Sequence, residues 1–290
     1  MNFPKRYLRS VPWICLTTAV ALMVQAVEPP PMQRPIAPDP QPPKGRKIPL
    51  ADGDVKFSLF VPQTWKATNQ TLTIHFHTAE WFVIQEHLRR GATHPLAVFY
   101  LGEGSSVYRR AFEDAKRFGR VLGIIEHELT VPVKDVEISS FSAGYGAVRE
   151  IIKTPAYVEH IRTIILADSI YAGRETNAVR QPLREHIDVW VPFASAAIKG
   201  EKTFVFTYSA VPTTTYASSS ECAHALVTAL NVTDLEVPPS STPAASDKDF
   251  PLLRRADAGN LHVWGYGGTN AQAHTTHARH AADIWKALGD

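Results

Sequence analysis

Cysteine is nearly absent from this sequence of 290 residues, which contains only Cys15 and Cys222. Cys15 lies in an apolar stretch close to the N-terminus, so a mature chain without that stretch keeps Cys222 alone. An internal disulfide is therefore excluded. A single cysteine in an apolar helical stretch is typical of a small buried residue, and we expect that environment for Cys222.

An excess of charge of either sign is also absent. The sequence has 30 Lys and Arg against 28 Asp and Glu, and three of the basic residues lie in residues 1–26, which have no acidic residue. The remaining chain has a formal charge of −1 and offers no basic patch, so we expect no nucleic-acid partner. No apolar run after residue 26 is long enough to cross a membrane.

Residues 1–26 have the pattern of a cleaved export signal. Lys5, Arg6 and Arg9 form a positive start, an apolar stretch follows over residues 11–24, and Ala26 ends a small-residue cleavage pattern. The apolar stretch is short for a transmembrane helix. We therefore expect an exported protein, periplasmic or secreted.

Proline is concentrated in residues 27–49, where it occupies nine of 23 positions. Such a run neither continues a helix nor pairs inside a sheet, so it predicts an extended tether. Residues 50–290 then have the length of a single domain with a sizeable core.

Within residues 50–290, apolar strand-like segments alternate with helical ones. Asp52-Gly53 predicts a tight turn that opens the domain with an antiparallel hairpin. The alternation that follows predicts an α/β fold with a mostly parallel central sheet and helices on both faces. The expected strands after the hairpin are Thr71–His77, Leu96–Leu101, Val136–Ser139, Thr163–Ala167, Thr203–Tyr208 and Asn260–Trp264, with helices at Glu80–Arg90 and Val107–Leu122.

Ser142 lies between a predicted strand, Val136–Ser139, and a predicted helix over residues 147–152. Its small neighbours Ser140 and Gly144 allow a sharp strand-to-helix bend, which would expose the serine hydroxyl at the sheet edge. This pattern is typical of a nucleophile, although a serine before a helix is also commonly an N-cap.

An activated serine needs a base, and His274 is our candidate because a glycine-rich loop after the last strand leads to it. We expect the final helix to begin after it, at Thr276 or His277, and to end at Leu288. His277 and His280 follow at helical spacing, which suits an exposed helix face. A metal cluster of these three histidines is the alternative, and we disfavour it because positions i and i+6 diverge on a helix.

Two carboxylates are candidates for the residue that orients the base. Asp168 ends the strand Thr163–Ala167, where a buried carboxylate must find donors. Glu221 follows the next strand, but Ser218 to Glu221 has the pattern of a capping box. We favour Asp168 over Glu221.

Backbone amides could stabilise an oxyanion beside Ser142. The amide of Ala143 lies at a predicted helix start, and a second amide is expected from Thr78 or Ala79, which open another helix. Tyr145 adjoins the bend and is included as a binding residue.

The order Ser142, Asp168, His274 on this pattern of elements resembles the α/β-hydrolase superfamily. Ser140 replaces the usual first glycine, and the acid follows an earlier strand than in most members. The resemblance implies acyl transfer to water through an acyl-enzyme, with no metal and no cofactor.

We therefore expect an exported serine hydrolase that cleaves a carboxylic ester, either in a small molecule or on a polymer. A peptidase or amidase would use the same groups, so the sequence leaves that alternative open. A binding module without catalysis is a third alternative, which we disfavour because serine, acid and histidine are all present.

Overall fold

The computed structural model of this chain describes residues 27–33, 42–175, 181–238 and 247–289. The expected export signal, residues 1–26, lies outside the described residues. None of the helices in the described ranges is both long and apolar enough to cross a membrane.

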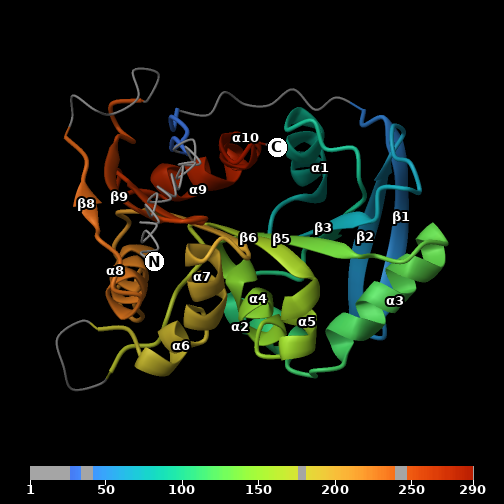
Figure 1. The fold of residues 1–290 in the computed structure, drawn as a ribbon, viewed down its shortest axis with the longest axis horizontal. Coiled ribbons are helices and arrows are strands. Elements are labelled where there is room, and N and C mark those ends of the chain that lie inside the picture. The colour runs from blue at the N-terminus through green and yellow to red at the C-terminus, as the bar shows by residue number, and fades with distance from the viewer. Residues whose placement is uncertain (1–26, 34–41, 176–180, 239–246, 290) are drawn as a thin grey trace, which may run out of the picture.

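Ten strands form one sheet in the order β1-β2-β4-β3-β5-β6-β7-β10-β9-β8, which runs across Figure 1. The six strands from β4 to β10 in this order are parallel, and antiparallel strands flank them on both sides. The expected mostly parallel sheet with an opening hairpin is therefore confirmed. The strands are β1 Gly45–Asp52, β2 Val55–Pro62, β3 Thr71–Phe76, β4 Leu96–Phe99, β5 Asp135–Phe141, β6 Ile161–Ala167, β7 Thr203–Ser209, β8 Leu235–Glu236, β9 Leu252–Ala258 and β10 Leu261–Tyr266.

Helices cover both faces of the sheet, as predicted. In Figure 1, α1, α9 and α10 lie above the sheet and α2 to α8 lie below it. The predicted helix over residues 107–122 is two helices, α2 and α3, separated at residues 113–116. The helices are α1 Glu80–Arg89, α2 Ser105–Phe112, α3 Arg117–Leu129, α4 Tyr145–Ile151, α5 Pro155–His160, α6 Arg184–Asp188, α7 Val191–Ile198, α8 Ser219–Ala229, α9 Ala271–Arg279 and α10 Ala281–Ala287.

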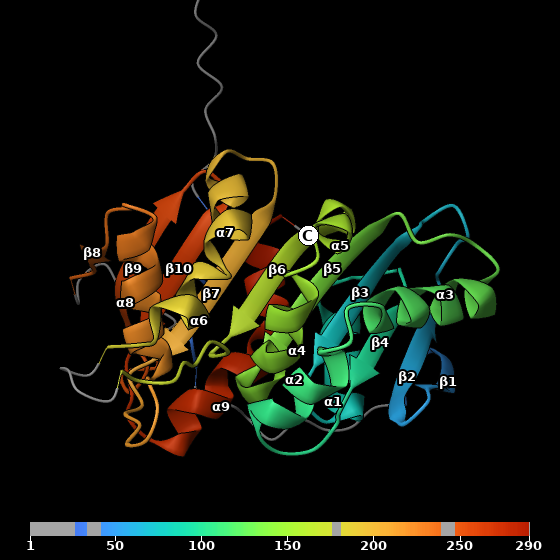
Figure 2. The same ribbon diagram turned by 90° about the horizontal axis from the view of Figure 1, so that it is seen from below.

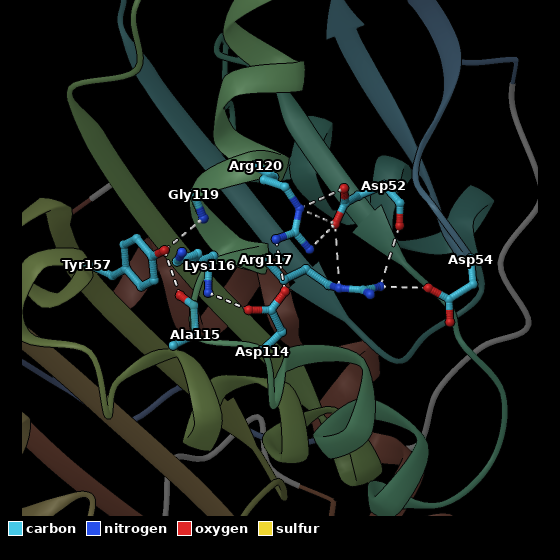
Figure 3. A network of polar contacts seen from close by, with 9 residues as sticks. All are labelled: Asp52, Asp54, Asp114, Ala115, Lys116, Arg117, Gly119, Arg120 and Tyr157. Atoms are coloured by element: carbon cyan, nitrogen blue, oxygen red, sulfur yellow. Dashed lines mark hydrogen bonds and ion pairs between the residues drawn. The ribbon is translucent and has the colours of Figure 1, made fainter.

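The hairpin is joined to α3 by a network of charged side chains (Figure 3). Asp52, at the turn, accepts three hydrogen bonds from Arg120, at 3.0, 3.1 and 2.9 Å. Arg117 pairs with Asp54 at 2.9 Å, and Arg120 also pairs with Asp114 at 2.9 Å. The edge strand β1 is therefore fixed to the helix that packs beside it.

The two ends of the expected tether at residues 27–49 pack against the domain. Met32 is fully buried in an apolar cluster with residues of β9, β10 and α10. Tyr266 donates to the carbonyl of Pro30 at 2.9 Å. At the other end, Gly45 begins β1, which tolerates Pro49 because it is the edge strand.

The C-terminal region differs from the prediction in where its helix begins. α9 starts at Ala271, because the Asn270 side chain accepts a hydrogen bond from the amide of Ala273 at 3.0 Å and caps the helix. His274 is therefore in the first turn of α9 and not in the loop before a later helix. The predicted continuous helix to Leu288 is also divided, at His280, into α9 and α10.

Candidate functional site

Ser142 lies where β5 ends and the chain turns into helix. A 3-10 turn, Ser142–Gly144, leads directly into α4. Ser142 has a φ of 48°, in the left-handed region, which costs a residue with a side chain about 1–3 kcal/mol. The surrounding backbone therefore holds this serine in a sharp strand-to-helix bend.

Two glycines allow other backbone to approach the bend. A Cβ on Gly144 would lie 2.4 Å from the carbonyl oxygen of Phe76 in β3, and one on Gly146 would lie 2.3 Å from that of Ser105 in α2. Both distances are far below van der Waals contact, so a side chain at either position would displace the bend or its neighbours.

Ser140 has a specific role in this bend that its small size alone did not indicate. It is buried, and its hydroxyl lies 2.8 Å from the hydroxyl of Ser169. Ser169 in turn donates to the carbonyl of Ser142 at 2.9 Å. This chain of hydroxyls holds the bend in place from the loop after β6.

Asp168 ends β6, has no exposed surface and has a φ of 45°. Its carboxylate accepts hydrogen bonds from the amide of Ser209 at 3.2 Å, from the hydroxyl of Ser209 at 2.5 Å and from the hydroxyl of Ser219. Burial raises the pKa of Asp168, but the hydrogen bond from His274 and the other donors outweigh it and hold the pKa below its usual value. The carboxylate is therefore ionised.

His274 projects from α9 toward this carboxylate. Its Nδ1 donates to Oδ2 of Asp168 at 2.7 Å, and its ring stacks on Phe141 with 4.5 Å between the ring centroids. Since Nδ1 carries the donated proton, Nε2 is free to accept one. The structure thus brings Asp168 and His274 together, and both His274 and Ser142 line one cleft.

The hydroxyl of Ser142 forms no hydrogen bond within the described part of the chain. Hydrogen bonds between a nucleophile and its base are often loose without substrate. The hydroxyl is therefore open to the cleft that His274 shares.

The rival carboxylate, Glu221, is part of the predicted capping box, which is confirmed. Its backbone amide donates to the hydroxyl of Ser218 at 3.3 Å, and its side chain accepts from the amide of Ser218 at 2.7 Å. It also pairs with Arg174 at 3.1 Å. Glu221 thus stabilises the start of α8, while Asp168 is the carboxylate bonded to His274.

His277 and His280 do not share the exposed face that we predicted. His277 is buried and lies 2.8 Å from the hydroxyl of Thr207 in β7, so that prediction is wrong for it. His280 is half-buried and lies 2.8 Å from Asp283. Because α9 begins at Ala271, one of its faces packs on the sheet and includes His277.

The cleft that contains Ser142 has a volume of ≈ 730 Å³. It opens at the carboxyl ends of the parallel strands, which in Figure 2 run toward the edge where α9 lies. Its wall includes the tyrosines Tyr145, Tyr171 and Tyr216, and Tyr145 donates to Ser105 at 3.1 Å. Among the described residues the lining has one carboxylate, Glu103, and no lysine or arginine.

The expected oxyanion residues do not all line the cleft that contains Ser142. Ala143 lines the cleft, whereas Thr78 lines a second, smaller cavity, where its hydroxyl lies 2.9 Å from Nε2 of His75. Ala79 lines neither and is the N-cap of α1. His77, with a φ of 66°, lies in the cleft wall, and burial lowers its pKa.

Sequence reasoning missed the residues that hold the acid. The hydroxyls of Ser209 and Ser219 belong to segments 41 and 51 positions from Asp168. The only available signal was that Ser209 ends a strand at the same sheet edge. Tyr171 also lies in the cleft wall, where its hydroxyl is 3.4 Å from Nδ1 of His274.

No family model matches the sequence, and a comparison with curated proteins found no significant match. Solved structures with a similar fold include LpqC, a poly(3-hydroxybutyrate) depolymerase from Bordetella parapertussis (12% identity, 83% of this chain and 88% of that chain, TM-score 0.51). A feruloyl esterase module from Clostridium thermocellum complexed with sinapinate is also similar (10% identity, 88% and 94%, TM-score 0.50). A structure described as FAE has a TM-score of 0.53 (10% identity, 89% and 94%).

At these identities the likeness concerns the fold. Together with the strand order and the helices on both faces, it shows that this chain has the α/β-hydrolase fold that the sequence resemblance implied. One fold serves many reactions, so the function of this chain depends on its site and not on its fold alone.

Proposed function

We propose that this protein is an exported serine hydrolase that cleaves carboxylic esters through an acyl-enzyme on Ser142. The observation that carries the proposal is the hydrogen bond from His274 to the buried Asp168. His274 and Ser142 both line the same cleft. A histidine held in one tautomer, in the same cleft as a half-buried serine at a strained bend, is suited to nucleophilic catalysis.

In the proposed reaction, Nε2 of His274 takes the proton of the Ser142 hydroxyl as its oxygen attacks the ester carbonyl. Asp168 keeps the His274 ring oriented and stabilises its protonated form. The proton then passes to the departing alcohol, which leaves the acyl group on Ser142. Water, deprotonated by His274, attacks the acyl group and releases the acid.

The negative charge on the carbonyl oxygen requires donors during both attacks. We propose the amide of Ala143, which lines the cleft at a helix start, as one donor. The second would be the amide of Thr78 or Ala79, because these residues directly follow His77, which lies in the cleft wall, although neither of them lines the cleft itself. Tyr145 contributes to the cleft wall beside them.

Labelling with a fluorophosphonate probe tests the nucleophile. We expect mass spectrometry to find the probe on Ser142, and Ser142→Ala to abolish labelling and turnover. Absence of labelling on folded protein would refute the serine hydrolase and favour a module without catalysis. Export is tested separately, by finding the mature protein outside the cytoplasm with Val27 as its first residue.

A comparison of 4-nitrophenyl esters with peptide anilides separates esterase from amidase activity. We expect esters to be cleaved with the higher kcat/KM, since an alkoxide leaves more readily than an anilide. Anilide turnover that rivals ester turnover would overturn the ester preference and assign the same groups to a peptidase or amidase.

A further inference from the structure

The proposed reaction leaves unused a tyrosine beside the cleft, Tyr100, which follows β4 and is 53% exposed. Its ring stacks on His77, with ring centroids 5.8 Å apart and planes 17° apart. Its hydroxyl donates to Glu103 at 2.7 Å. Since His77 and Glu103 both line the cleft of Ser142, the Tyr100 ring is held at the rim of that cleft with much of its surface uncovered.

Tyr100 also lines a second groove of ≈ 550 Å³, outside the cleft. The other walls of this groove come from β1, β2, β4 and the start of α1. One aromatic ring thus touches the cleft wall on one side and lines the groove on the other. A substrate whose reactive ester lies at Ser142 could extend across Tyr100 into this groove.

The polar groups along this path include the carboxylates of Glu103 and Glu80 and the ammonium of Lys56, which also lines the groove. Oε1 of Glu103 accepts from Tyr100, and Oε2 has no hydrogen-bond partner within the described ranges. Glu80 and Ser58 line the groove, where Glu80 pairs with Lys47 at 3.1 Å. Carboxylate oxygens can accept from sugar hydroxyls, whereas a polyester chain, rich in carbonyl oxygens, offers them no donor.

An exposed tyrosine ring beside carboxylates suits a sugar ring, whose C–H face packs on the aromatic face while its hydroxyls reach the flanking acceptors. The two carboxylates are balanced by Lys56 and by Lys47, which pairs with Glu80, so the path has no net charge that would favour an anionic polymer. We propose that the groove binds the saccharide part of a neutral saccharide ester, with a sugar ring on Tyr100 and a sugar hydroxyl on Glu103. This inference rests on the proposed ester hydrolysis for the role of the bound saccharide.

Binding to polysaccharide tests the groove without requiring turnover. The Ser142→Ala protein is run in native gels that contain arabinoxylan, mixed-linkage β-glucan or galactomannan, with anionic galacturonan in a fourth gel. We expect at least one neutral polysaccharide to retard it, and Tyr100→Ala in the same background to raise the Kd at least tenfold. Tyr100→Phe keeps the ring and should lose less affinity than Tyr100→Ala.

Trp81→Ala is the matched control, because Trp81 is a similarly exposed aromatic on α1 that lines neither the cleft nor the groove. It should leave the Kd unchanged, and thermal unfolding verifies that each variant is folded.

Three results would overturn the saccharide groove: no retardation by any neutral polysaccharide, equal retardation of the Tyr100→Ala protein, or stronger retardation by galacturonan. The proposed hydrolase is tested independently by labelling of Ser142. If Ser142 is not labelled but retardation still depends on Tyr100, the saccharide groove is supported and the proposed hydrolase is refuted.

Discussion

Asp168 and His274 are 106 positions apart in the chain and joined by a hydrogen bond of 2.7 Å between Oδ2 and Nδ1. The carboxylate has no exposed surface, whereas the histidine side chain is 23% exposed at the cleft. The bond therefore connects a fixed buried charge to a ring that substrate can reach. If the ring is the base, its tautomer depends on this carboxylate.

Asp168→Asn tests that dependence. The amide can donate to Nδ1, which would leave the proton of His274 on Nε2 and prevent it from accepting the proton of Ser142. We expect kcat to fall by about 10⁴-fold with little change in KM. Steady-state kinetics on 4-nitrophenyl acetate, with circular dichroism to verify the fold, provide the measurement.

Glu221→Gln is the comparison for the same assay, because Glu221 is the other carboxylate that the sequence offered. It should lower the free energy of unfolding by about 1 kcal/mol, through the weakened cap, and keep kcat within a few fold. An inactive Glu221→Gln protein beside an active Asp168→Asn protein would show that our assignment of the acid is wrong.

Gly146→Ala should disturb the bend at Ser142. The new Cβ would meet the carbonyl oxygen of Ser105 at 2.3 Å, and relief requires α2 and α4 to move apart. We expect a loss of about 1–3 kcal/mol in the free energy of unfolding and reduced labelling of Ser142. Urea denaturation and the fluorophosphonate probe measure the two effects.

Gly123→Ala is the matched control in an exposed part of α3, where nothing lies within 4 Å of the added Cβ. There the substitution should stabilise by about 0.5–1 kcal/mol. If both variants behaved alike, close packing at the bend would not explain the effect.

The bend at Ser142 could be predicted because it is local: strand, small residues and helix follow one another within about fifteen positions. Asp168 could be predicted because a polar residue at the end of an apolar strand has to lie at the edge of the sheet. His274 was found for its position after the last strand, but its helix was not, because we interpreted Asn270 as part of the loop and not as a cap.

The surroundings of these residues could not be predicted, because they depend on contacts between distant segments. Ser219 reaches Asp168 only after α8 packs beside β7, and Met32 is buried only against strands more than 200 positions later. A proline-rich composition indicates an extended chain, yet it does not say whether that chain lies free or against the domain. The prediction that His277 lies on an exposed face was wrong for the same reason, because its partner Thr207 is 70 positions away in the chain.

The charged network around the hairpin predicts unequal effects of two aspartates (Figure 3). The Asp52 side chain is 14% exposed and accepts from two nitrogens of Arg120, whereas that of Asp54 is 85% exposed. Asp52→Asn should lower the unfolding midpoint by roughly 2–4 °C, and by less in 1 M NaCl, because salt screens the pairs. Asp54→Asn should have no measurable effect. Equal shifts in a thermal scan would refute this account.

The buried histidines predict how stability depends on pH. Burial lowers the pKa of His75 to about 3 and that of His277 to about 4, from 6.5. Below pH 6.5 the two histidines are therefore protonated in the unfolded chain while they stay neutral in the folded chain, down to their lowered pKa values. Stability from these groups is fully present above pH 6.5 and is lost as the pH falls toward 4, by up to about 1.4 kcal/mol per pH unit for each histidine.

Between pH 6 and 5 this loss can be separated from carboxylate titration, since Asp and Glu lie lower. The free energy of unfolding, measured by urea at several pH values, should fall more steeply for the wild type than for His277→Gln. His160→Gln, at an exposed position, should retain the wild-type slope. If the stability of the His277→Gln protein fell with pH as steeply as that of the wild type, His277 would be protonated in the folded state. That result would refute the lowered pKa of His277.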